Sequence, residues 1–239
     1  MVHPPFGGDP LPGAGCPLRR SAHGVHIVDV ALLIAEGVQA DGKRSVLGVS
    51  VSLSEAEVHW RTFLAALLER GLHGVTLIVS DDHAGLKQAR QATLPAVPWQ
   101  RCQWHLQQKA QAYVPQQALR AEVAQALRDI FHAPDREEAD RMLEHFTKRY
   151  EKIAPKRTEW AQENIPEGLT VFALPQAHWM RLRTTNGLER LNREIKRRTR
   201  VAAIFPNVEA LLRLARALLV EIDEKWKIGK IYLNMKSEN

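Results

Sequence analysis

The stretch VTLIVSDDHAGL, residues 75–86, joins a compact apolar run to a polar turn and then to a helical pattern. Val75 to Val79 is rich in β-branched residues and stops at Ser80-Asp81-Asp82, which favours a short buried strand. A helix is predicted from about His83 to Gln91. This order of strand, turn and helix is typical of an α/β sheet, in which functional groups gather at the carboxyl ends of the strands.

Upstream of this stretch, the sequence predicts a β-hairpin and a helix. Ile27 to Val38 is mostly apolar, Asp41-Gly42 signals a turn, and Ser45 to Leu53 is rich in valine. Ser54 is expected to cap the helix that follows. Hairpin, helix, strand and helix together imply a sheet that is covered on at least one face.

Downstream, Trp99 to Cys102 is a candidate strand, and the chain beyond about His105 is predicted to be helical. Helical patterns cover Ala118 to Arg149, broken at Ala133-Pro134, and continue in Asn186 to Arg198 and Asn207 to Trp226. The predicted divisions are an irregular segment rich in proline and glycine (1–24), the first part of an α/β core (25–104), a helical insertion (105–178) and the last part of the core with its helices (179–239).

Composition sets limits on the function. The 239 residues, 45% of them hydrophobic, are enough for one sizeable domain or for a domain with a large insertion. The formal charge of +6 is compatible with a polyanionic partner and equally with a merely basic protein. Two cysteines, Cys16 and Cys102, predict no disulfide framework and a reducing, cytoplasmic environment. The most apolar helical stretch is too short to span a bilayer, so we expect no membrane role.

Asp81 is the first candidate functional residue, because it stands where the apolar strand stops. Asp81 or Asp82 could instead cap the helix that follows, which is a common role for aspartate. Cys102 and His105 form a C-x-x-H pair of residue types that bind zinc. Two ligands do not complete a tetrahedral site, so a structural role in packing and hydrogen bonding is favoured for this pair.

The segment TTNGLERLNREIKRR, residues 184–198, is the most informative in the chain. As a helix it gathers Asn186, Glu189, Arg193 and Lys196 on one polar face, where a carboxylate beside cations could bind a metal and face phosphates. Asn186 and Glu189 also have the spacing of a capping box. The basic residues exceed what a helix end requires and are interpreted as DNA phosphate contacts: Arg190, Arg193, Lys196, Arg197, Arg198 and Arg200.

Several stretches, in order, resemble the Mutator-type transposases of bacterial insertion sequences. The similar segments are AEGVQADGKRSVLG (35–48), SEAEVHW (54–60), RGLHGVTLIVSDDHAGL (70–86), WQRCQWH (99–105) and TTNGLERLNREIKRR (184–198). The stretches at 204–207 and 226–232 are also similar to the end of the family's pattern. The resemblance runs from about Ile27 to the last residues.

This resemblance implies an α/β fold with a ribonuclease H-like mixed sheet, an all-helical insertion and C-terminal helices. It implies an Asp-Asp-Glu triad that holds two Mg²⁺ ions, with Asp81 matching the second Asp, Glu189 the Glu, and Cys102 and His105 the family's C-x-x-H. Two such ions, about 3.5 to 4 Å apart, would activate the attacking hydroxyl and stabilise the leaving oxygen. The implied partners are element ends and target DNA, with a second copy or an intact transposase as the protein partner.

The sequence departs from the family where the first Asp of the triad is expected. That residue would lie on a strand before Ile27 to Val38, but the sequence there is GGDPLP (7–12), whose prolines oppose a central strand. Asp9 is therefore a poor candidate, and Asp29 falls on the second strand. We expect the first strand and its carboxylate to be missing, the chain to be truncated at its N-terminus, and residues 1–24 to lie outside the family resemblance.

Three functions remain open from the sequence. The first is an enzyme, a transposase that cleaves and transfers DNA strands with Mg²⁺. The second is a catalytically inactive remnant that binds DNA or an intact transposase. The third is a Mg²⁺-dependent, structure-selective nuclease on the same fold, since a fold alone does not define a function. Joining of a 3′ end to target DNA would distinguish the first from the third.

Overall fold

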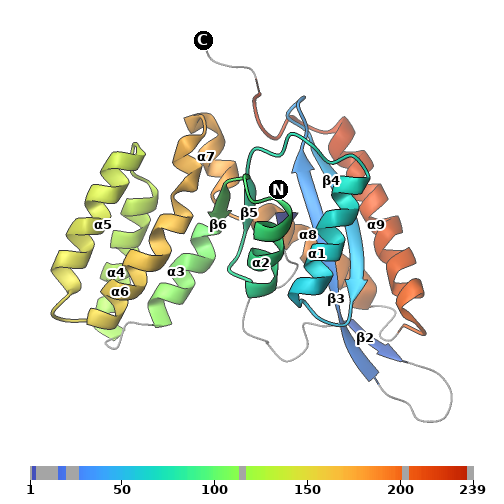
Figure 1. Cartoon of the computed structure of the whole chain (residues 1–239), viewed down its shortest axis with the longest axis horizontal. Coiled ribbons are helices and arrows are strands. Elements are labelled where there is room, and N and C mark those ends of the chain that lie inside the picture. Colours follow the sequence, from blue (N-terminus) through green and yellow to red (C-terminus); the bar gives the residue numbers. More distant parts are fainter. Residues whose placement is uncertain (1, 4–15, 20–26, 113–116, 201–204, 236–239) are drawn as a thin grey trace. The chain divides into compact units, whose positions relative to one another are not determined.

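Strands and helices form a mixed α/β arrangement in the computed structural model, in which strands predominate early in the chain and helices follow (Figure 1). The structure describes residues 2–3, 16–19, 27–112, 117–200 and 205–235. The chain divides into two units, which we describe one at a time: the sheet unit, residues 1–97 with 185–239, and the helical unit, residues 98–184. The sequence predicted the helical part as 105–178.

The predicted β-hairpin forms the centre of the sheet unit. Strand β3 (Ile27–Val38) pairs antiparallel with β4 (Arg44–Ser52), in a register that shifts once, between Ala35 and Glu36. Gly42 makes the connecting turn with a φ of 80°, a conformation that favours glycine. The Asp41-Gly42 signal in the sequence therefore located this turn correctly.

Residues 1–24 are not wholly irregular, which corrects the prediction. β1 (Val2–His3) pairs antiparallel with β3 at Ile34 and Ala35, and β2 (Cys16–Arg19) pairs antiparallel with the first residues of β3. Because Ile34 and Ala35 also pair with β4, β1 lies along the opposite edge of β3. Strand pairing with β3 overrides the local preference of a segment rich in proline and glycine.

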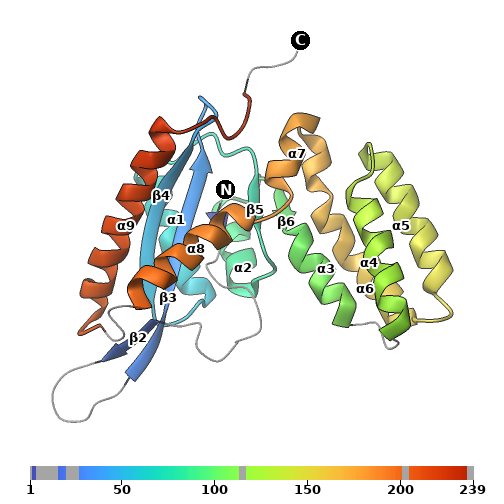
Figure 2. The same ribbon diagram turned by 180° about the vertical axis from the view of Figure 1, so that it is seen from behind.

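Helices cover both faces of the β3–β4 hairpin (Figure 2). On one face, α1 (Glu57–Glu69) approaches closely at Gly48, where an added Cβ would lie 2.8 Å from Leu67. On the other face, α8 (Asn186–Thr199) and α9 (Val208–Ile228) share an apolar cluster with Ile34. The cluster's other buried members come from α8 and α9: Leu188, Leu191, Ile195 and Leu219.

The strand and helix that carry Asp81 are shorter or shifted relative to the prediction. β5 spans Ile78–Ser80, not Val75 to Val79, and α2 spans Ala84–Thr93. α2 is capped by His83, whose Nδ1 accepts a hydrogen bond from the Leu86 amide at 3.4 Å. Neither Asp81 nor Asp82 occupies the N-cap position of this helix.

The start of α1 also differs from the prediction. Ala56 is its N-cap residue, without a side-chain cap, and the Ser54 hydroxyl accepts only from the Ala56 amide. The capping box expected at Ser54 is therefore wrong. At the other end Gly71 follows the helix with a φ of 96°, a conformation that favours glycine after a helix.

The helical unit is a small all-helical bundle after one short strand. Its apolar core includes Leu106, Leu127, Phe146 and Ile165. None of the described helices, here or in the sheet unit, is long and apolar enough to cross a membrane. The elements are β6 (Trp99–Arg101), α3 (Gln103–Ala112), α4 (Gln117–Phe131), α5 (Arg136–Tyr150), α6 (Pro155–Asn164), two 3-10 turns (Ile165–Gly168 and Thr170–Ala173) and α7 (Gln176–Leu182).

Polar side chains of β6 form hydrogen bonds with the turns that follow α6. Gln100 donates to the Gly168 carbonyl at 2.7 Å and accepts from the Val171 amide at 2.7 Å. Arg101, almost fully buried, donates to Asn164 at 2.7 Å and forms an ion pair with Glu167 at 3.0 Å. Buried polar groups are tolerated when they are hydrogen-bonded in this way, so these residues have a structural role.

Candidate active site and nucleic-acid interface

Asp81 lies directly after β5, at the carboxyl end of the strand, as the sequence predicted. Its exposed fraction is only 3%, and the neighbouring Ser80 hydroxyl donates to the Asp81 carbonyl at 2.8 Å. An ionised carboxylate is costly to bury unless positive charge or hydrogen-bond donors compensate for its lost hydration. The position therefore suits a carboxylate that works with cations better than one that serves as a surface cap.

Glu189 lies in the first turn of α8, in the same sheet unit as Asp81. The Thr185 hydroxyl donates to Glu189 Oε1 at 3.0 Å, and the Glu189 amide donates to the Thr185 carbonyl. Thr185 is the N-cap residue and has no side-chain cap, while Asn186 is the first helical residue and is exposed. The capping box of Asn186 and Glu189 is therefore not formed, and Thr185 orients the carboxylate instead.

A buried ion pair that was not predicted from the sequence supports the start of α8. Glu36 on β3 is 2% exposed and pairs with Arg44 on β4. The Arg44 guanidinium stacks over the Trp226 ring, 3.7 Å from its centroid. An added Cβ at Gly187 would lie 3.1 Å from Arg44 Nη2, so the first turn of α8 packs directly against this pair. The pairing of oppositely charged residues across the predicted hairpin was the available signal.

A second acidic group is close to the residues after β5. The Nε2 atom of His83 lies 3.0 Å from Glu55 Oε2. Because His83 Nδ1 accepts a hydrogen bond, Nε2 carries the ring proton and donates to Glu55. Burial raises the pKa of Glu55 from near 4.5 to about 7. The contact between Glu55 and His83 joins the segment before α1 to the start of α2. His83 is two residues after Asp81.

The basic residues of α8 divide into two groups. Arg190, Arg193 and Arg200 are exposed, whereas Arg197 and Arg198 both bind Glu194. These two guanidiniums hold the pKa of Glu194 down at about 2. Arg198 also reaches Glu221 on α9 at 2.8 Å, and Lys196 is half-buried. The basic face predicted for DNA is thus partly neutralised at the end of the helix.

Cys102 and His105 lie in the helical unit, at the start of α3. Their ligand atoms are within 4.8 Å of each other, so the C-x-x-H spacing brings the two side chains together. Cys102 is fully buried, and the His105 ring packs edge-on against Trp104. Of the two aspartates considered for a first carboxylate, Asp29 lies in β3 opposite Pro17, and Asp9 lies outside the described residues.

The site thus combines a buried carboxylate at the end of a strand, a second carboxylate on a basic helix and a helical unit that lies between them in the sequence. The pattern of the Mutator family of transposases matches residues 17–229, and the chain belongs to that family. Because the match begins at residue 17, the prediction that the whole of residues 1–24 lies outside the family is wrong for its last part.

Individual relatives are named as transposases of particular elements. The chain is 61% identical over 208 residues to the transposase for insertion sequence element IS406 of Burkholderia multivorans, covering 87% of this chain and 54% of that protein. It is 42% identical to the transposase for ISRM5 of Rhizobium meliloti, over 87% and 52% of the two chains. For IS1081 of Mycobacterium tuberculosis the identity is 38%, over 88% and 50%. The chain spans about half the length of these relatives.

Proposed function

We propose that this chain is the catalytic part of a DNA transposase of an insertion sequence, and that Asp81 and Glu189 are its metal-binding carboxylates. The burial of Asp81, 3% exposed at the carboxyl end of β5, carries the proposal. Carboxylate oxygens are the ligands that Mg²⁺ prefers, so the two residues fit this ion. When bound, Mg²⁺ would polarise the phosphate and lower the pKa of a bound hydroxyl.

The protein's own contribution is orientation. The Thr185 hydroxyl donates a hydrogen bond to one oxygen of Glu189. The ion pair of Glu36 and Arg44 packs against the first turn of α8, which carries Glu189. A metal ligand that is held in this way needs little reorganisation when the ion and the DNA bind. We also propose a ribonuclease H-like core for the sheet unit, supported by its antiparallel hairpin followed by α1, β5 and α2.

DNA is the proposed substrate, held through its phosphates by the exposed cations of α8. Arg190 and Arg193 are the main candidates, since Arg197 and Arg198 already bind Glu194. Each phosphate contact that is removed should lower the slope of log K against log salt by about 1. We expect Arg190→Gln with Arg193→Gln to lower the slope by about 2, and Arg197→Gln alone to change it little. Equal effects of the two changes would contradict this division.

Catalysis is tested with duplexes that carry the ends of element IS406, a supercoiled target plasmid, and Mg²⁺ or EDTA. The matched variants are Glu189→Gln and Glu209→Gln, since Glu209 is an exposed glutamate in the first turn of α9. We expect the unmodified chain and Glu209→Gln to cleave DNA and join 3′ ends to the plasmid. Glu189→Gln should bind DNA within about twofold of the unmodified chain and cleave none.

The outcomes separate the candidate functions. Undiminished cleavage by Glu189→Gln would remove this residue from the active site. Cleavage without joining would favour the structure-selective nuclease. DNA binding by the unmodified chain with neither reaction would favour a catalytically inactive form that acts by binding DNA or an intact transposase.

A further inference from the structure

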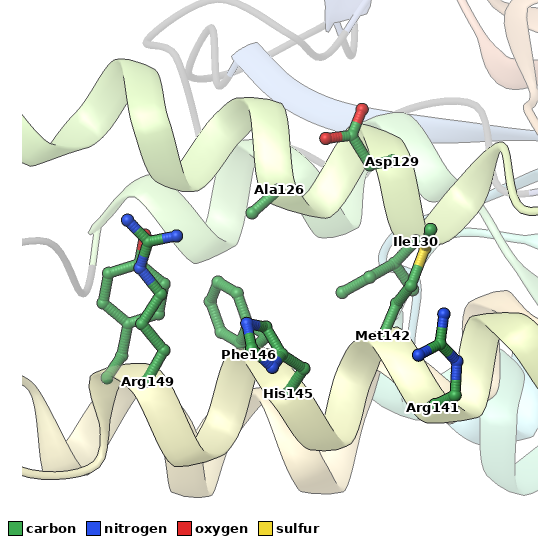
Figure 3. Close-up of a pocket in the computed structure, with 9 residues that line it drawn as sticks. Ala126, Asp129, Ile130, Arg141, Met142, His145, Phe146 and Arg149 are labelled. Atoms are coloured by element: carbon green, nitrogen blue, oxygen red, sulfur yellow. The ribbon is translucent and has the colours of Figure 1, made fainter.

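The helical unit contains a groove between α4 and α5, with a volume of about 360 Å³ (Figure 3). Its floor is apolar: Ala126 and Ile130 come from α4, and Met142 and Phe146 from α5. Phe146 packs against the Tyr150 ring, 4.8 Å between centroids, which fixes this side of the floor. Ile130 and Phe146 are almost fully buried, so the partly exposed Ala126 and Met142 form the apolar surface that a ligand can contact.

One edge of the groove carries a regular row of basic side chains. Arg141, His145 and Arg149 all line the groove, are exposed, and follow one another at intervals of four residues on α5. Residues four apart on a helix lie about 6 Å apart along its axis and on the same face. The row thus offers cationic or hydrogen-bonding groups one helical turn apart, beside the apolar floor.

The present partners of these arginines do not block a ligand. Arg141 binds Glu138 at 2.6 Å and Arg149 binds Glu122 at 2.7 Å, but all of these pairs lie at the surface. Exposed ion pairs contribute little to stability and exchange partners readily. The acidic residue that lines the groove from α4 is Asp129, whose carboxylate Figure 3 shows pointing away from it. The charged groups that line the groove are therefore two exposed guanidiniums and one carboxylate that points away.

We propose that this groove binds an unpaired stretch of DNA, with bases against the apolar floor and phosphates along the row of Arg141, His145 and Arg149. Single strands are bound by basic tracks that follow the backbone beside apolar and aromatic surfaces that contact the bases. A duplex keeps its bases stacked inside and would leave the floor unused. The inference rests on the proposed function, because strand cleavage and transfer expose unpaired DNA.

The test measures binding of a labelled twelve-residue oligothymidine and of a hairpin duplex to the full chain by fluorescence anisotropy in EDTA. The groove variant is Arg141→Gln with Arg149→Gln. The matched control is Arg136→Gln with Lys148→Gln, two exposed cations of α5 that form similar ion pairs but do not line the groove. A third variant, Met142→Gln, makes the floor polar without changing charge.

We expect the groove variant to bind the oligothymidine about tenfold more weakly, with the salt slope lowered by about 1.4, while the duplex loses less than about twofold. The control should change both affinities by less than about twofold. Met142→Gln should weaken the single strand about threefold with an unchanged salt slope, because stacking contacts release no counterions.

Three results would overturn the proposal: equal losses for single strand and duplex, equal losses for groove and control variants, or binding of the duplex without the single strand. In each of these the chain still binds DNA, so the proposed function survives. Failure of the unmodified chain to bind either DNA would overturn both.

Discussion

The two units bury opposite charges. Among the described residues of the sheet unit, the nearly inaccessible charged groups are carboxylates, Glu36 at 2% and Asp81 at 3% exposure. In the described part of the helical unit they are guanidiniums, Arg101 and Arg157, each 1% exposed. Buried carboxylates attract cations, whereas buried guanidiniums bind protein oxygens and aromatic rings. The difference agrees with the proposal that the metal site lies in the sheet unit, and it gives the helical unit's buried charges a structural role.

The largest effect is expected where a buried carboxylate loses its cation. Arg44→Met would leave Glu36 buried without its partner and remove the stacking on Trp226. We expect the free energy of unfolding to fall by about 4 kcal/mol. Urea unfolding measures the loss, and hydrogen exchange of the β3 and β4 amides locates it in the sheet unit. Adding Glu36→Gln should recover at least half, and no recovery would show that Arg44 acts mainly through its packing.

A smaller loss is expected for the corresponding pair in the helical unit. Arg101→Met removes the hydrogen bond to Asn164 and the ion pair to Glu167. The Glu167 side chain is 25% exposed, so water can hydrate it after the substitution. We expect a loss of about 3 kcal/mol in the free energy of unfolding. Urea unfolding of both arginine variants under one condition compares the units. A larger loss for Arg101→Met than for Arg44→Met would reverse the comparison.

The pH dependence of stability tests a third carboxyl group of the sheet unit. Burial raises the pKa of Glu55 in the folded protein to about 7, above its ordinary value near 4.5. The folded state therefore holds the proton more tightly, and this contribution is complete below about pH 4.5 and lost as the pH rises through 7. The free energy of unfolding should therefore fall as the pH rises, and Glu55→Gln should make this fall smaller by about 1 kcal/mol. If the free energy of unfolding changes equally with pH in the unmodified chain and in Glu55→Gln, Glu55 does not titrate in this range.

The smallest effect is expected at Arg157. Its guanidinium lies 5.3 Å from the Tyr150 ring centroid, and burial lowers its pKa. Replacing a buried charge with an apolar side chain of similar length is often neutral, so Arg157→Met should change the free energy of unfolding by less than about 1 kcal/mol. Thermal and urea unfolding both measure this change. A loss as large as that expected for Arg101→Met would show that this cation is as strongly bound as Arg101.

The sequence predicted the features that depend on local patterns. The hairpin followed from two apolar runs around Asp41-Gly42, and the helix predicted from Asn207 to Trp226 corresponds to α9, which Asn207 caps. The ion pairs of Glu194 with Arg197 and Arg198 are separated by three and four residues. That spacing could have predicted them.

Other features depend on contacts between distant residues and could not be predicted in this way. β1 forms because β3 offers an edge, not because its two residues favour a strand. His83 caps α2 while its other ring nitrogen binds Glu55, a pairing of residues far apart in the sequence. The groove beside Met142 likewise requires α4 and α5 to pack together. Recognising Asp81 and Glu189 as a pair needed the family resemblance as well as the pattern.

Calorimetric titration of Mg²⁺ into the purified chain tests the central claim most directly, with Asp81→Asn and Glu189→Gln as variants and Glu209→Gln as the control. If the two carboxylates form the metal site, the unmodified chain and Glu209→Gln will bind the ion, and both other variants will lose that binding. Binding that persists in Asp81→Asn, or no binding by the unmodified chain, would contradict the account.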